Sequence, residues 1–186
     1  MFRNWHFSLK YCICSCLIFL VVIGLGWESA SKGFTSPLLS VSGGESLPLV
    51  IIDAGHGGED CGAIGVNGVY EKDINLAISF ALGDWLSSVG YPVLFTRVED
   101  KLLYTEEQNI KGQRKAYDLR NRLEIAQKHP GSIFVSIHMN SFSDGQYSGL
   151  QVWHNGGELS KSVAEGIQST VRELLQKGNT RKVKTA

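Results

Sequence analysis

Leu49-Val-Ile-Ile-Asp-Ala-Gly-His-Gly-Gly58 joins a short apolar run to a histidine set among glycines. An apolar run of this length, rich in Val and Ile, predicts a buried strand. The glycines allow the backbone to turn sharply at the end of the strand and leave the ring of His56 uncovered. Because α/β proteins place their chemistry at the carboxyl ends of their strands, this turn is a candidate functional site.

A second apolar run, Ser132-Ile-Phe-Val-Ser-Ile-His-Met-Asn140, also predicts a strand with a histidine, His138, at its carboxyl end. Glu71 lies between the two histidines in the sequence, at the start of a predicted helix. Two histidines and one carboxylate, with one position left open, form the ligand set of a catalytic zinc. The spacing alone leaves a satisfied core histidine as an alternative, because no helical His-x-x-x-His pair joins the ligands.

Strands and helices alternate along the rest of the predicted domain. This order predicts an α/β fold with a mainly parallel sheet and helices on both faces. Asp73 is the expected N-cap of the first helix. Besides the two strands above, the predicted elements are a helix from Asp73 to Val89, a strand over 91–96, a helix over 113–128, a strand over 149–153 and a helix over 158–177. Apolar residues at helical spacing predict the faces that these helices bury: Ile74, Ala77, Ile78, Ala81, Leu82, Trp85 and Val89; Ala116, Leu119, Leu123 and Ala126; Leu159, Val163, Ile167, Val171 and Leu174.

The N-terminal part of the chain has the pattern of an export segment. Arg3 and Lys10 precede a charge-free run over 11–26. Because a helix needs roughly 17–25 apolar residues to span a bilayer, residues 1–26 are either a cleaved signal peptide or a membrane anchor. Residues 27–48 are rich in Ser and Gly and are interpreted as a linker. The folded domain is expected over 49–186.

The composition excludes some classes of function. The 18 basic and 18 acidic residues give a formal net charge of +0, so no nucleic-acid partner is predicted. Of the 4 cysteines, Cys61 alone lies beyond the N-terminal apolar run, so the domain has no disulfide framework.

Three further residues are candidates for the site. Asp53 and Asn140 each lie near one of the histidines at a strand end, where a hydrogen bond to an imidazole would fix its tautomer. A loop-capping role for Asp53 is weighed equally. His154 also follows a strand, but we interpret it as an exposed loop histidine.

Five motifs follow one another along the predicted domain: Val50-Ile-Ile-Asp-Ala-Gly-His-Gly-Gly58, Glu71-Lys72, Thr96-Arg97, Leu119-Arg-Asn-Arg-Leu-Glu-Ile-Ala126 and Ser136-Ile-His-Met-Asn140. With these motifs in this order, the chain resembles the bacterial zinc-dependent N-acetylmuramoyl-L-alanine amidases from about Leu49 onward. Segments 112–116, 148–151 and 180–184 are most similar to the germination-specific amidases of endospore formers.

The resemblance implies that His56, Glu71 and His138 bind Zn²⁺. It also implies that the substrate is peptidoglycan, cut at the amide between the muramic acid lactyl group and L-alanine of the stem peptide, in spore cortex. The expected location is exported: the outer face of the cytoplasmic membrane, the cell wall or the forespore intermembrane space. The N-terminal segment would contact the membrane, and any accessory protein is unknown.

The chain departs from the family pattern at its C-terminal end. The family continues past the third helix to a strand and a Glu-x-Gly-Phe-like motif, whose glutamate is the general base. We therefore expect an incomplete amidase domain with no catalytic residue identified and very slow hydrolysis or none, since Glu106 and Glu107 are poor substitutes. The alternatives are a non-catalytic zinc-retaining wall-binding or vestigial protein, and a carboxypeptidase-like zinc hydrolase.

Overall fold

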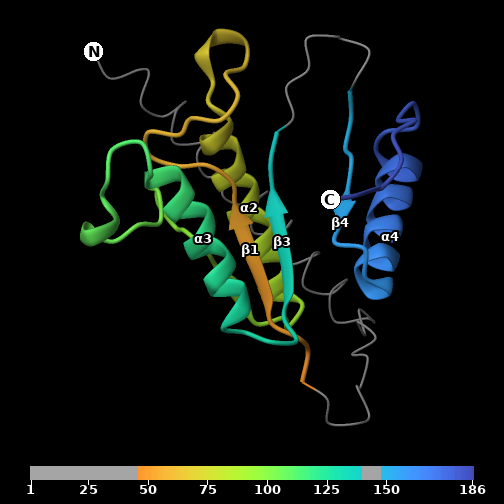
Figure 1. The fold of residues 1–186 in the computed structure, drawn as a ribbon. Coiled ribbons are helices and arrows are strands. Elements are labelled where there is room, and N and C mark those ends of the chain that lie inside the picture. Colours follow the sequence, from red (N-terminus) through yellow and green to blue (C-terminus); the bar gives the residue numbers. More distant parts are fainter. Residues whose placement is uncertain (1–45, 140–147) are drawn as a thin grey trace, which may run out of the picture. The chain divides into compact units, whose positions relative to one another are not determined.

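A parallel sheet of three strands, in the order β2-β1-β3, organises the computed structural model, which describes residues 46–139 and 148–186. Figure 1 shows the strands of this part of the chain with the helices that pack on them. The elements that the structure describes are β1 (Val50–Ala54), η1 (Val66–Gly68), α2 (Glu71–Ser88), β2 (Val93–Phe95), η2 (Glu106–Gln108), α3 (Arg114–Gln127), β3 (Ile133–Ile137), β4 (Trp153–His154), α4 (Glu158–Leu174) and β5 (Lys184–Thr185).

The strand that ends at the histidine turn is the centre of the sheet. All five residues of β1 are buried. It pairs in parallel with β2 on one side and with β3 on the other. The prediction of a mainly parallel α/β sheet is therefore confirmed, and parallel pairing brings the carboxyl ends of β1 and β3 to one edge.

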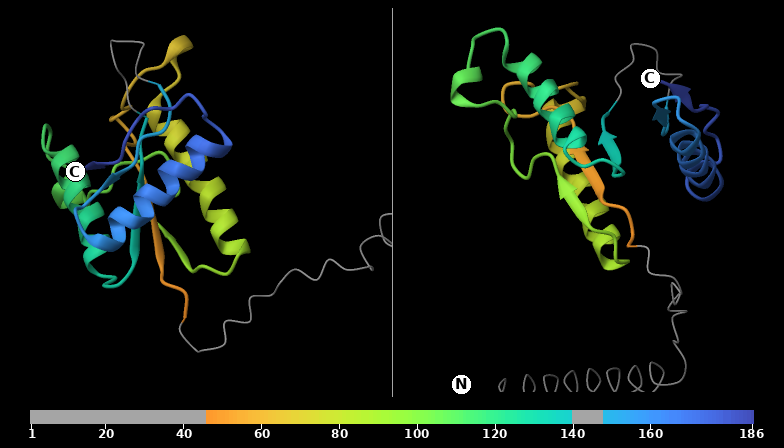
Figure 2. Two further views of the ribbon diagram at one scale, coloured as in Figure 1. Left: turned by 90° about the vertical axis from the view of Figure 1, so that its right-hand side faces the viewer. Right: turned by 60° about the horizontal axis from the view of Figure 1, so that its bottom comes forward.

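Helices α2 and α3 cover opposite faces of this sheet (Figures 1 and 2). Ile52 and Phe95 are in register, so their side chains share a face. Helix α2 packs there, with Gly83 so close that an added Cβ would lie 2.2 Å from Phe95. Asp53 points to the other face, where Arg122 of α3 meets it at 2.6 Å. Helices on both faces, as predicted, follow from this alternation.

The buried faces of the helices differ from the predicted apolar stripes, which were wrong in detail. In α2 the predicted residues Ile78 and Trp85 are 41% and 62% exposed. In α3 Leu119 and Leu123 are 60% and 56% exposed. The buried positions are instead Glu71, Asn75, Ser79 and Gly83 in α2, Asp118 and Arg122 in α3, and Ala164 and Gln168 in α4.

Each helix presents a buried polar side chain to backbone carbonyls, which explains the difference. Asn75 of α2 donates to the Gly55 carbonyl at 3.2 Å, and Arg122 of α3 donates to the Ala54 carbonyl at 2.8 Å. Gln168 of α4 donates to the Leu150 carbonyl at 3.0 Å. A buried backbone carbonyl needs a donor, so these contacts set which side of each helix faces inward.

Two predicted element boundaries are also wrong. Helix α2 begins at Glu71, with Tyr70 rather than Asp73 as N-cap, because the backbone N–H of Glu71 donates to the Ala63 carbonyl at 2.9 Å. The strand predicted over 149–153 is confined to β4, which pairs in parallel with β5 in a separate two-stranded sheet. The Val152 N–H and the Leu150 carbonyl bond to the Gln168 side chain, whereas the Val152 carbonyl accepts the backbone N–H of Lys184 in β5 at 3.1 Å.

Several predictions fall outside the described residues. They include the export segment over 1–26, nearly all of the linker over 27–48, and Asn140. Within the described parts of the chain, no helix combines the length and apolarity that crossing a bilayer requires.

Candidate metal centre

His56 occupies a backbone conformation that few residues other than glycine adopt. Its φ is +62°, in the left-handed region, and the next two residues, Gly57 and Gly58, also have positive φ. Such a conformation costs of order 1–3 kcal/mol and persists only where the surroundings hold it. Here Gly57 and Asp60 exchange two backbone hydrogen bonds of 3.0 Å, which close the loop behind the histidine.

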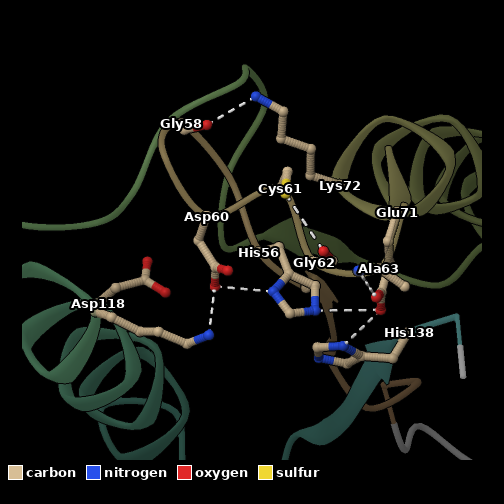
Figure 3. A network of polar contacts seen from close by, with 12 residues as sticks. His56, Gly58, Asp60, Cys61, Gly62, Ala63, Glu71, Lys72, Asp118 and His138 are labelled. Carbon is tan, nitrogen blue, oxygen red and sulfur yellow. Dashed lines mark hydrogen bonds and ion pairs between the residues drawn. The ribbon is translucent and has the colours of Figure 1, made fainter. Parts of the chain in front are cut away.

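Three side chains from three elements converge at the edge of the sheet (Figure 3). Nε2 of His56 lies 3.2 Å from Oε1 of Glu71, and Nδ1 of His138 lies 3.1 Å from the same oxygen. The two imidazole rings are 4.8 Å apart, centre to centre, and nearly perpendicular at 79°. One donor atom from each residue lies within 4.8 Å of the other two, so the three can hold one metal ion.

The carboxylate of Glu71 is fixed on both oxygens. Oε2 accepts the backbone N–H of Ala63 and Oε1 that of Met139, both at 2.8 Å. Burial opposes ionisation of this group, but the two backbone hydrogen bonds and the nearby His56 outweigh it and lower the pKa of Glu71. The carboxylate is therefore charged at neutral pH and ready to bind a cation.

Asp60 orients the ring of His56. Its Oδ2 accepts a hydrogen bond from Nδ1 of His56 at 2.8 Å, and Lys115 of α3 lies 3.0 Å from the same oxygen. Burial opposes the charge of Asp60, but hydrogen bonds from His56 and Lys115 outweigh it and lower the pKa of Asp60. Because an ionised carboxylate only accepts, Nδ1 carries the proton and Nε2 is left for a metal.

Two glycines make room for the candidate ligands. A Cβ on Gly55 would lie 2.3 Å from the ring of His138. A Cβ on Gly62 would lie 2.6 Å from the ring of His56 and 2.7 Å from Oε2 of Glu71. Side chains at either position would displace a candidate ligand, so the glycine-rich sequence around His56 serves the packing of the site as well as its turn.

The structure brings together His56, Glu71 and His138, but it gives Asp53 a different place from the one predicted. In the part of the chain that the structure describes, Asp53 contacts neither imidazole and caps no loop. Its carboxylate accepts hydrogen bonds from Thr96 at 2.7 Å, Ser136 at 2.6 Å and Arg122 at 2.6 Å. Arg122 then donates to the His56 carbonyl at 2.8 Å, so Asp53 is linked to the turn indirectly.

Asp60, which contacts the candidate ligand His56, was not predicted from the sequence. It lies four residues after His56 in a glycine-rich loop that has no periodicity to interpret. The available signal in the sequence was an acidic residue close to the candidate ligand His56. His154, in β4, is not part of the metal-capable group among the described residues; its Nδ1 lies 3.1 Å from the backbone N–H of Gly156.

The donor set fits zinc, which accepts imidazole nitrogen and carboxylate oxygen together. The hydrogen bond from His56 to Asp60 is the kind of outer contact that orients such a ligand. Fold and site thus define an α/β protein with a candidate metal centre at the carboxyl edge of its sheet. The sequence pattern of the N-acetylmuramoyl-L-alanine amidase family matches residues 50–186, and the chain belongs to this family.

Relatives and solved structures agree with this membership. The chain is 36% identical over 144 residues to a germination-specific N-acetylmuramoyl-L-alanine amidase of Bacillus subtilis (strain 168), covering 75% of this chain and 60% of that protein. It is 35% identical over 123 residues to the amidase AmiA of Escherichia coli (strain K12), covering 66% of this chain and 37% of AmiA. The chain thus spans 60% or less of the length of these two relatives.

Among solved structures, the CwlD amidase of Clostridioides difficile, determined in complex with the GerS lipoprotein, is similar with a TM-score of 0.70 and 39% identity. That match covers 75% of this chain and 72% of the other. The catalytic domain of the amidase CwlV of Bacillus (Paenibacillus) polymyxa var. colistinus is similar with a TM-score of 0.57 and 27% identity, covering 75% and 70%. Both support the α/β fold with its parallel sheet.

Proposed function

We propose that this chain carries the zinc centre of an N-acetylmuramoyl-L-alanine amidase, with His56, Glu71 and His138 as the ligands. The observation that carries the proposal is the convergence of the two rings on one Glu71 oxygen, at 3.2 and 3.1 Å. When bound, zinc supplies a Lewis acid that polarises the amide carbonyl and activates water. Membership of the amidase family supports this assignment.

The chain's own residues would prepare the site for the ion. Asp60 holds the proton on Nδ1 of His56, and the backbone N–H groups of Ala63 and Met139 hold the Glu71 carboxylate. Within the described residues, Asp60 and Glu71 are the carboxylates that contact the candidate ligand rings, and both already serve the metal site. We therefore assign no general base among them.

The substrate we propose is peptidoglycan, cut between the muramic acid lactyl group and L-alanine. Spore cortex is the proposed setting, since the Bacillus subtilis relative is a germination-specific amidase. We further propose that the protein is exported and that residues 1–26, which lie outside the described parts, act as its signal peptide or anchor.

The test is to purify the full chain, measure its zinc content and incubate it with cortex peptidoglycan. We expect one zinc per chain and a release of stem peptides with free L-alanine amino ends. The control is His138→Ala, which should bind no zinc and release nothing.

Two outcomes would contradict the proposal. Absence of zinc from the wild-type chain would remove the metal centre. A zinc-loaded chain that binds peptidoglycan but releases no more peptide than His138→Ala would favour a non-catalytic wall-binding protein instead.

A further inference from the structure

We propose that Arg97 and Arg122 are positioning residues that clamp the turn Ala54–His56 and thereby align His56 with Glu71. The inference rests on the proposed function, in which His56 and Glu71 bind zinc. It assigns a role to the Thr96-Arg97 pair and to Arg122, which the metal site itself does not explain.

The two guanidinium groups bind three successive backbone carbonyls of the turn. The Ala54 carbonyl accepts from Nε of Arg97 and from Nη1 of Arg122, both at 2.8 Å. The Gly55 carbonyl accepts from Nη2 of Arg97 at 3.1 Å, and the His56 carbonyl from Nη2 of Arg122 at 2.8 Å. A turn with left-handed His56 cannot pair these carbonyls as a strand would, so side chains must satisfy them.

The arginines approach the turn from opposite faces of the sheet. Arg122 belongs to α3, on the face of Asp53. Arg97 follows Thr96, whose hydroxyl bonds Asp53 on that same face, so alternation directs Arg97 to the side of α2. Because the arginines bind the turn from both sides, they restrain its backbone dihedral angles better than contacts from one side would.

Arg97 also connects the turn to the start of α2. Its Nη2 donates to the Lys72 carbonyl at 2.8 Å and to the Gly55 carbonyl at 3.1 Å. Lys72 directly follows Glu71, so a single planar group spans the segments that carry two of the three proposed ligands. The planar guanidinium fixes the directions of Nε, which binds the Ala54 carbonyl, and of Nη2, which binds the other two. A lysine would have to reach all three carbonyls from one freely rotating nitrogen.

The burial and the charged partners of both arginines support their role in holding the turn. Arg97 is 2% and Arg122 5% exposed. The described hydrogen bonds of Arg97 all go to backbone carbonyls, while Arg122 also pairs with Asp53 at 2.6 Å and with Asp118 at 2.9 Å. Burial and the charge of Arg122 lower the pKa of Arg97. The buried guanidinium groups of Arg97 and Arg122 can lie beside the proposed metal site because the buried carboxylates of Asp53 and Asp118 offset their charge.

The experiment compares Arg97→Lys and Arg122→Lys with Arg172→Lys in the full chain. Arg172 of α4 is a matched control, because it also donates to two backbone carbonyls, at 3.0 Å to Asn179 and 2.8 Å to Arg181, away from the turn. Three properties are measured: zinc affinity by competition with a chelator, the absorption spectrum of bound Co²⁺, and amide hydrogen exchange of residues 55–58 without metal.

We expect both clamp variants to bind zinc about 10–100-fold more weakly, the usual cost of losing a partner that orients a ligand. Their Co²⁺ spectra should shift, and the amides of residues 55–58 should exchange faster. Arg172→Lys should leave all three unchanged, even if its melting temperature falls. Should Arg122→Lys not fold, Arg97→Lys decides the same question.

Clamp variants that lose thermal stability but keep the zinc affinity, the Co²⁺ spectrum and the exchange rates of the control would overturn the inference. A wild-type chain that binds no zinc would overturn the proposed function instead. The exchange measurement needs no metal and would still decide whether the arginines hold the turn.

Discussion

Asp60 and His56 share a hydrogen bond of 2.8 Å that fixes which ring nitrogen faces the candidate metal position. A neutral imidazole has one donor nitrogen and one acceptor nitrogen. With Nδ1 donating to Asp60, Nε2 is the acceptor, and it lies 3.2 Å from Oε1 of Glu71. Lys115 contacts the same Asp60 oxygen at 3.0 Å, so α3 holds the carboxylate in place.

Replacing Asp60 should therefore weaken metal binding without removing a ligand. We expect Asp60→Ala to bind zinc about 10–100-fold more weakly than the wild type, because the ring of His56 loses its tautomer and its orientation. Chelator competition measures the change. Glu59→Ala is the matched control, since Glu59 is the neighbouring acid and its described ion pair is with Arg114, at 2.7 Å, and not with a histidine ring. Equal affinities for the two variants would argue against the role of Asp60.

Substitution of the proposed ligands should have a larger effect. We expect His56→Ala and His138→Ala to abolish stoichiometric zinc, because two remaining ligands are too few to hold the ion. Glu71→Gln should weaken binding less, since an amide oxygen still coordinates but carries no charge. Elemental analysis of the purified chains gives the zinc content, with His154→Ala as the control. Full zinc retention in both histidine variants would rule out the proposed ligand set.

The crowding around Gly62 leads to a third prediction. Gly62 and Gly68 both have positive φ, +67° and +76°, so alanine is strained to a similar degree at either position. A Cβ at Gly62 would strike His56 and Glu71, whereas a Cβ at Gly68 meets nothing within 4 Å. Gly62→Ala should therefore lose zinc affinity by about tenfold or more, the effect of displacing a ligand. Gly68→Ala should lose only stability; similar zinc affinities for the two variants would contradict this reading.

The strands and the convergence of the site could be predicted from the sequence because both depend on local patterns. Apolar runs of Val and Ile ended at His56 and at His138, and parallel pairing then brings strand ends together. The Asp60 contact could not be predicted in the same way. It depends on the left-handed φ of His56 and on the closed loop behind it, and no residue pattern specifies those dihedral angles.

The buried faces of the helices were missed for a different reason. Apolar periodicity predicted a face through Ile78 and Trp85, but α2 buries Asn75 and Ser79. Asn75 is inward because it reaches the Gly55 carbonyl at 3.2 Å, a demand that arises only after the turn has formed. A long-range hydrogen bond of this kind can decide which face of a helix is buried. Apolar periodicity indicates only that the helix is amphipathic.

Export can be tested in cells. The basic flank and the charge-free run over 11–26 should direct the domain across the cytoplasmic membrane. Protease added to intact protoplasts should then digest the protein, with a cytoplasmic protein as the protected control. Digestion only after lysis would contradict the predicted location.

The pH dependence of stability should report the buried pair of Asp53 and Arg122. Burial opposes the charge of Asp53, but Arg122 and the hydroxyls of Ser136 and Thr96 outweigh it and hold its pKa below the usual value of about 3.9. An acid with a lowered folded-state pKa stabilises the fold above its unfolded pKa. This stabilisation is lost as the pH falls through the folded value.

We therefore expect Asp53→Asn to lower the free energy of unfolding by roughly 3 kcal/mol near neutral pH, the low end of the cost of leaving one buried charge unpaired. The low end applies because Arg122 keeps its 2.9 Å contact with Asp118. The difference from the wild type should shrink as the pH falls from about 4, near the unfolded-state pKa, through the lower folded-state pKa of Asp53. Urea unfolding of the full chain at a series of pH values measures it, with the exposed Asp84→Asn as the control. A difference between wild type and Asp53→Asn that stays constant down to the acid limit would show that the charge of Asp53 contributes nothing.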